Sequence, residues 1–108
     1  MEARKLRGFI QIAMRHLNRF GTREDFLIVL EIAAQQEEGQ HLTLKQLVHW
    51  GAVPESTLKR RLARLVKLGH VVKTAVSNDR RVFHYSVTDK TMQRLEIMLR
   101  DLRSHRWS

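Results

Sequence analysis

Apolar residues recur at the three- and four-residue spacing of an α-helix in five stretches of the chain. The pattern predicts helices over residues 2–20, 22–38, 43–50, 54–68 and 88–103. The second is apolar nearly all round, so we expect it to be central and buried. The first and last each have one apolar face, which in the first helix consists of Leu6, Ile10, Ala13, Met14 and Leu17.

Threonine and proline mark the starts of several helices. Thr22, Thr43 and Thr88 can each accept a hydrogen bond from a backbone N–H of the first turn, and Asp25 would complete a capping box with Thr22. Pro54 suits the first position of its helix, because no backbone donor is needed there. The short turn before Pro54 joins two helices and predicts a helix-turn-helix over about residues 43–69.

Two β-prone segments, residues 71–74 and 82–87, follow the helix-turn-helix. Ser77, Asn78 and Asp79 lie between them and favour a turn, so a β-hairpin, or wing, is predicted over about residues 71–87. We expect the Asp79 carboxylate to structure the tip, either by accepting hydrogen bonds from turn amides or by pairing with a nearby arginine. The predicted fold is mainly α with a small β-hairpin wing, a winged helix-turn-helix that forms a single domain over residues 1–108.

The positive charge of the chain is concentrated in this region. The net charge is +9, and nine Lys and Arg but only two acidic residues lie between Lys45 and Arg81. A cationic third of a small domain is typical of a protein that binds a polyanion, although a basic surface can also be merely solvated. A basic helix beside an arginine-tipped hairpin favours duplex nucleic acid as the partner.

The helix over residues 54–68 separates an apolar face from a cationic face. Its leucines recur on the side that should point inward: Leu58, Leu62 and Leu65. We expect Arg60 to pair with guanine in the major groove, and Arg64 and Lys67 to contact phosphates. The predicted DNA-binding residues are Ser56, Thr57, Lys59, Arg60, Arg61, Arg64 and Lys67 on this helix, with Arg80 and Arg81 at the wing.

From Thr43 to Thr91 the chain resembles the winged helix-turn-helix of MarR-type transcriptional regulators. The residues that carry the resemblance are Leu42, Thr43, Leu47, Ser56, Thr57, Leu58, Arg60, Leu65, Gly69, Asp79, Arg81, Val87, Thr88 and Lys90. The resemblance implies a sequence-specific regulator that binds double-stranded DNA, with Arg81 as the arginine that enters the minor groove. The chain departs from the family pattern at Pro54 and Thr91, and it has room for only one helix after the wing.

Several classes of chemistry find no support in the sequence. There is no cysteine, which excludes disulfides and a thiol switch within these residues. The six histidines show no metal-binding spacing, and neither a catalytic motif nor a phosphate-binding loop is present, so we expect no metal, no cofactor and no enzyme activity. The chain begins without a secretory apolar core and has no run that could span a membrane, so we expect a cytoplasmic, nucleoid-associated protein.

The flanking helices over 2–20 and 88–103 suggest a homodimer, because their apolar faces could meet across a two-fold axis. A small-molecule effector is compatible with the family, but nothing in the sequence supports one. Two alternatives remain at this point. The winged helix could be a protein-interaction module of a larger assembly, or it could be a replication-initiator or architectural DNA-binding protein, which would use the same contacts.

Overall fold

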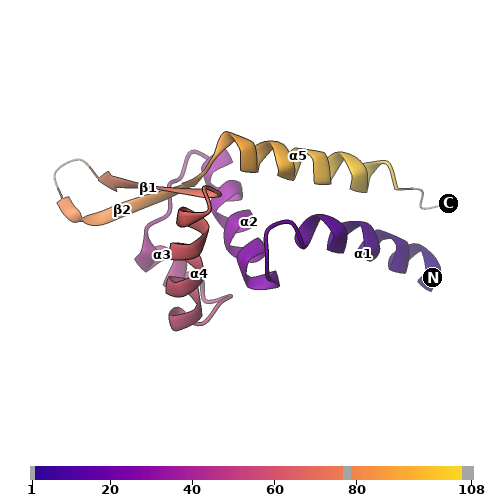
Figure 1. The fold of residues 1–108 in the computed structure, drawn as a ribbon, viewed down its shortest axis with the longest axis horizontal. Coiled ribbons are helices and arrows are strands. Elements are labelled where there is room, and N and C mark those ends of the chain that lie inside the picture. The colour runs from indigo at the N-terminus through magenta and orange to yellow at the C-terminus, as the bar shows by residue number, and fades with distance from the viewer. Residues whose placement is uncertain (1, 77–78, 106–108) are drawn as a thin grey trace.

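The computed structural model describes residues 2–76 and 79–105, without the side chains of Asp79 and Arg80. Within these residues the chain forms five helices and a two-stranded antiparallel hairpin, so the predicted winged helix-turn-helix is confirmed (Figure 1). The elements are α1 (Ala3–Leu17), α2 (Arg23–Glu37), α3 (Leu44–Trp50), α4 (Glu55–Lys67), β1 (Val71–Val76), β2 (Asp79–Val87) and α5 (Asp89–Arg103).

The molecule is elongated, with extents of 54 × 26 × 23 Å. Its radius of gyration is 15.5 Å, against the ~13 Å typical of a compact domain of ~100 residues. The hairpin projects from one end, α1 and α5 lie side by side at the other, and α2, α3 and α4 form the middle (Figure 1). The two flanking helices therefore make an arm that leaves the winged-helix core.

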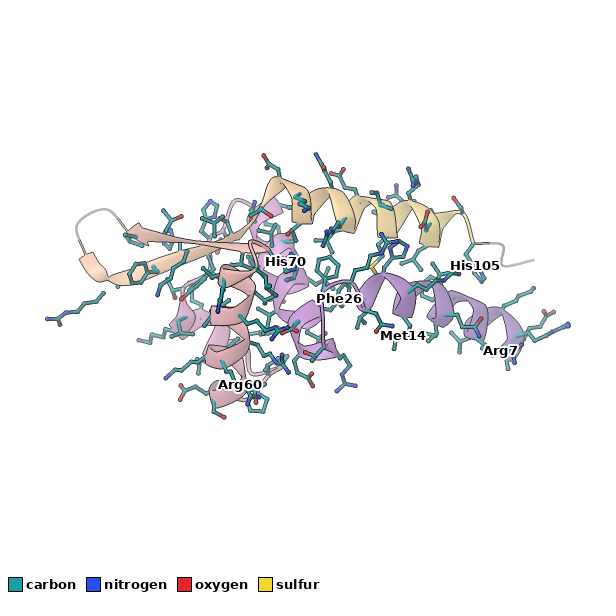
Figure 2. All side chains as sticks on the ribbon, in the orientation of Figure 1. Arg7, Met14, Phe26, Arg60, His70 and His105 are labelled. Carbon is teal, nitrogen blue, oxygen red and sulfur yellow. The ribbon has the colours of Figure 1, made fainter. Side chains whose placement is uncertain are left out.

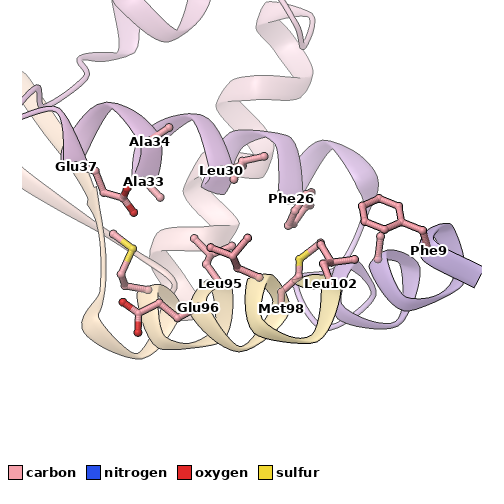
Figure 3. Close-up of a pocket in the computed structure, with 13 residues that line it drawn as sticks. Phe9, Phe26, Leu30, Ala33, Ala34, Glu37, Leu95, Glu96, Met98 and Leu102 are labelled. Carbon is pink, nitrogen blue, oxygen red and sulfur yellow. The ribbon is translucent and has the colours of Figure 1, made fainter. Parts of the chain in front are cut away.

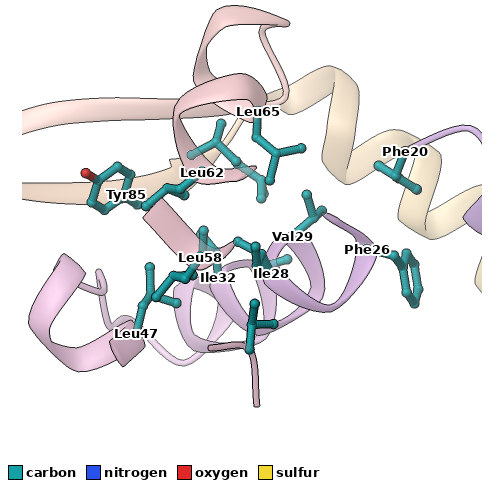
Figure 4. Packing of buried hydrophobic residues seen from close by; sticks show 14 of the residues in the cluster. Phe20, Phe26, Ile28, Val29, Ile32, Leu47, Leu58, Leu62, Leu65 and Tyr85 are labelled. Atoms are coloured by element: carbon teal, nitrogen blue, oxygen red, sulfur yellow. The ribbon is translucent and has the colours of Figure 1, made fainter. Parts of the chain in front are cut away.

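The core lies between α2 and α4. Ile28, Val29 and Ile32 of α2 meet Leu58 and Leu65 of α4, and all five side chains are fully or almost fully buried (Figure 4). Truncation of such a side chain to alanine typically costs about 2–5 kcal/mol. This packing fixes which side of α4 faces the protein.

Local capping sets the helix starts as the sequence predicts. Asp25 and Thr22 form the reciprocal capping box of α2, and Thr43 forms a second one with Gln46 of α3. Thr88 caps α5 by accepting a hydrogen bond from the backbone N–H of Thr91. Pro54 differs, because its extended ψ of 144° makes it the N-cap of α4 and the helix begins one residue later.

The wing is anchored at its base. Val71 pairs with Val87, and the pairing continues outward to a register shift between Ala75 and Val76. The Gln36 side chain of α2 accepts a hydrogen bond from Val87 N at 2.8 Å. Strand β2 starts at Asp79 rather than at 82, because the shifted register pairs Val76 with a residue that we expected in the turn.

Much of the apolar stripe of α1 is left uncovered by the other described residues. Leu6, Ile10 and Met14 are 45%, 49% and 47% exposed. Helix α2 is largely buried, as predicted, but its Leu30 is 43% exposed because the arm does not close over that face. Within residues 2–76 and 79–105, the arm therefore leaves apolar surface on two helices uncovered.

Candidate nucleic-acid interface

Helix α4 presents a cationic surface to solvent. Its three leucines, Leu58, Leu62 and Leu65, are buried as predicted. The side chains of Ser56, Lys59, Arg60, Arg64 and Lys67 are exposed, and Thr57 is half-buried. The helix therefore brings five of its seven predicted DNA-binding residues fully to the surface, and Thr57 partly.

Glu55 does not neutralise this surface. Its Oε2 lies 3.9 Å from Lys59 Nζ, and both side chains are more than half exposed. A surface pair of this kind contributes about 0–1 kcal/mol at most, so Lys59 can exchange Glu55 for a phosphate at little cost. Glu55 also lies in the first turn of α4, where the helix dipole favours an anion.

Arg61 departs from the prediction, because it turns inward. Its Nη1 lies 3.7 Å from Asp25 Oδ2 of α2, and its side chain is only 26% exposed. The helical period places residue 61 at the edge of the leucine face, where a buried carboxylate on another helix decides its direction. The surface of α4 that a polyanion can reach therefore includes only a minor part of the Arg61 side chain.

At the wing, Arg81 is exposed on β2. The side chains of Asp79 and Arg80 lie outside the described residues, so the tip-structuring role of Asp79 and the DNA contact of Arg80 stay predictions. The hairpin extends away from α4 (Figures 1 and 2), so the helix and the wing can reach different parts of an elongated ligand.

Lys73 was not among the residues predicted to bind DNA. It is exposed on β1, with Nζ 4.2 Å from the centre of the Phe83 ring, a cation–π contact that orients it along the hairpin. Lys59 and Lys73 lie on opposite walls of a groove between α4 and the wing, which Tyr85 also lines. The charge of Lys73 is evident from the sequence. Its position beside Lys59 depends on how the hairpin packs against α4, which the sequence does not show.

Two ionisable groups near this surface have shifted pKa values. Burial, with Arg94 and Lys90 of α5, lowers the pKa of His70 below 6.5, although Asp25 opposes the shift. Burial raises the pKa of Tyr85 above 10.0. Both groups are therefore neutral near pH 7, and the positive charge of the interface comes from lysine and arginine.

An apolar hollow of about 420 Å³ lies between α1, α2 and α5 (Figure 3). Phe9, Phe26 and Leu30 line it with side chains of α5, and Glu37 and Glu96 reach its edge. Met98 is 9% exposed and packs into the core, whereas Met14 is 47% exposed. The volume falls in the range of small-molecule sites, so an effector, for which the sequence gives no support, would be sought in this hollow.

Residues 2–76 and 79–105 show neither a metal-binding cluster nor a membrane-spanning helix. Within this part of the chain, no three His, Cys, Asp or Glu side chains gather in a way that could hold a metal ion. No helix there has the length and the apolar character needed to cross a membrane.

No protein-family model matches the chain, and no curated protein matches it. Solved structures do match. They include MarR from E. coli in its apo form (21% identity, TM-score 0.65, covering 92% of this chain and 74% of that one) and the transcriptional regulator Tm0710 from Thermotoga maritima (24%, 0.68, 93% and 71%). Reduced AbfR bound to DNA is also similar (27%, 0.64, 91% and 66%).

The chain thus spans about two thirds to three quarters of the lengths of these regulators. Two of the matches cover 91–93% of this chain. The fold of this protein is the winged helix-turn-helix of MarR-type transcriptional regulators.

Proposed function

We propose that this protein is a transcriptional regulator that binds double-stranded DNA in a sequence-specific manner. The observation that carries the proposal is the exposed cationic face of α4 beside a cationic wing, on a helix whose three leucines are buried in the core. The DNA-bound structure of AbfR, at 27% identity, supports the same use of the fold.

In the proposed complex the N-terminal half of α4 enters the major groove. Arg60 reads guanine, while Arg64 and Lys67 contact phosphates and fix the register without reading sequence. Arg81 of the wing reaches the adjacent minor groove, whose negative potential attracts a guanidinium. Lys59 and Lys73 hold the DNA backbone where it passes between helix and wing. The activity is binding, with no chemical step, and its place is the nucleoid.

A homodimer completes the proposal. The uncovered stripe of α1 and the exposed Ile97 and Leu99 of α5 supply apolar surface on the arm that two copies can share across a two-fold axis. Two recognition helices would then meet successive major grooves, about 34–36 Å apart along the DNA.

Selection of bound sequences from a random duplex pool tests the proposal. We expect an enriched palindromic site, and binding to that site should weaken steeply with salt because several phosphates are neutralised. Failure to bind any duplex at low salt would exclude a DNA-binding function. Binding without enrichment of a sequence would instead indicate an architectural protein.

A further inference from the structure

Arg61 is an arginine on the recognition helix that does not share the surroundings of its neighbours. Arg60 and Arg64 are exposed, whereas Arg61 lies against α2 with Nη1 3.7 Å from Asp25 Oδ2. Successive residues of an α-helix are turned by about 100°. The Cα–Cβ bond of residue 61 therefore points to the edge of the leucine face, and turning that bond fully outward would require a rotation of α4 that lifts its leucines out of the core.

The partner of Arg61 is held rigidly. Asp25 is 1% exposed, and its Oδ2 accepts a hydrogen bond from Thr22 N at 2.9 Å in the capping box of α2. Within the described residues, its Oδ1 is buried without a hydrogen-bond donor. Gly21 passes so close to this carboxylate that a Cβ there would collide with Oδ2. Asp25 therefore offers a buried negative charge in a fixed place, which only Arg61 approaches from α4.

The apolar contacts between α2 and α4 are strong but have little directionality, because hydrophobic burial depends on area rather than on angle. A guanidinium and a carboxylate add direction, and buried polar pairs can set the register of packed elements. Asp25 is also the last residue of a capping box, so the start of α2 and the middle of α4 are linked through one carboxylate.

From this arrangement we propose that Asp25 and Arg61 form a positioning pair that sets the rotation of α4, and that Arg61 does not contact DNA. The pair directs Arg60 and Arg64 outward together. This inference rests on the proposed DNA-binding function, since it concerns how the recognition helix is aimed. The inference removes Arg61 from the DNA contacts expected from the sequence. It adds Asp25, which the DNA cannot reach, to the residues that determine how well α4 binds DNA.

The experiment measures the affinity of the full chain for its selected operator and for a random duplex over a range of salt concentrations. The variants are Arg61→Met, Asp25→Asn and the double variant, with Arg60→Met and Arg64→Met as matched changes on the exposed face. Asn at residue 25 keeps an oxygen for Thr22 N–H and loses the charge. Circular dichroism and thermal unfolding define a temperature at which every variant is folded.

We expect Arg60→Met and Arg64→Met each to reduce the salt slope by about one, as the loss of a DNA charge contact does. Arg61→Met and Asp25→Asn should leave the slope unchanged and weaken operator binding about tenfold, with random-duplex binding little altered. The double variant should be no weaker than either single variant, because residues in contact couple strongly. A role in stability alone would lower the melting temperature and leave the operator affinity of the folded protein intact.

A reduced salt slope for Arg61→Met, or unchanged operator affinity for Asp25→Asn, would overturn the positioning pair while leaving DNA binding intact. Absence of duplex binding by the unaltered chain would overturn the proposed function, and the positioning pair with it. If Arg61→Met does not fold, Asp25→Asn tests the positioning pair by itself. Asp25 is buried and cannot touch DNA, so a loss of operator affinity with an unchanged salt slope would mean that it acts through the position of α4.

Discussion

His16 Nε2 lies 2.8 Å from Asp101 Oδ2, a contact that joins α1 to α5 across the length of the chain. His16 is buried to 9% exposure, and the carboxylate is partly exposed. A second histidine, His105, bonds the backbone oxygen of Lys5 at 3.1 Å near the far end of the same helix pair. The arm is therefore held together by polar contacts as well as by apolar packing.

Replacement of Asp101 by alanine should loosen this arm. We expect Asp101→Ala to lower the free energy of unfolding by about 1 kcal/mol, the usual net value of one hydrogen bond, reduced by the exposure of the carboxylate. Urea unfolding followed by circular dichroism measures the change. Gln93→Ala, an exposed substitution on the same helix, is the control, and equal stability of the two variants would show that the contact contributes nothing.

Gly21 is required by both its backbone and its surroundings. Its φ of +115° is a conformation that other residues avoid, and a Cβ there would collide with Asp25 Oδ2. Gly39 has a similar positive φ of +82°, but a Cβ there would meet nothing within 4 Å. Substitutions at the two glycines therefore distinguish the cost of backbone strain, which both share, from the cost of a steric collision, which arises only at Gly21.

We expect Gly39→Ala to cost about 1 kcal/mol of folding free energy from strain alone. Gly21→Ala should cost about 1–2 kcal/mol more, because the buried carboxylate of Asp25 must also move. Chemical denaturation of both variants measures the difference. Equal losses would mean that Asp25 can shift freely, which would also weaken its role as a fixed partner for Arg61.

Local signals in the sequence predicted most of the fold. The capping boxes of α2 and α3 each lie within four consecutive residues, between Thr22 and Asp25 and between Thr43 and Gln46. The helical spacing of the leucines identified the buried side of α4. Such signals need no knowledge of distant parts of the chain. They gave the element order and the helix that presents the candidate site.

The features that the sequence missed depend on contacts between elements. Arg61 is at the border of two helix faces, and its direction is decided by Asp25 of another helix. Lys73 joins the interface only because the hairpin brings β1 beside α4. Similarly, the period of α1 revealed an apolar stripe but could not show that this chain leaves it uncovered.

Arg81 tests the wing as a DNA contact. We expect Arg81→Ala to weaken operator binding by about 1–3 kcal/mol, the value of a lost charge-assisted contact. A mobility-shift titration at physiological salt measures the loss. Arg103→Ala is the matched control, because it removes an arginine from the end of α5 opposite the wing (Figure 1). Unchanged affinity for Arg81→Ala would remove the residue from the interface.

His70 should make the fold sensitive to mild acid. Burial, with Arg94 and Lys90, lowers the pKa of His70 below 6.5 in the folded protein. As the pH falls, the unfolded chain therefore binds more protons at His70 than the folded chain does, which favours unfolding. The stability contributed by neutral His70 is fully present above pH 6.5 and is lost as the pH falls through the folded-state pKa.

We therefore expect the unfolding free energy of the unaltered chain to fall more between pH 7 and pH 5 than that of His70→Gln. Urea unfolding at a series of pH values gives the two profiles, and His49→Gln, at an exposed position of α3, controls for the loss of a histidine. Parallel profiles for the unaltered chain and His70→Gln would contradict the expected sign.

Ile10 tests the proposed dimer, because it is the middle and most exposed residue of the uncovered stripe of α1. A glutamate at this position would bury a charge without a partner if two copies meet there, and the cost of such burial is large. We expect Ile10→Glu to shift the protein from dimer to monomer in sedimentation velocity and to weaken binding to a palindromic site far more than to an isolated half-site. Gln11→Glu adds the same charge at the next exposed position of α1 and should leave the dimer intact. A monomeric unaltered chain, on and off DNA, would show that the stripe has another use.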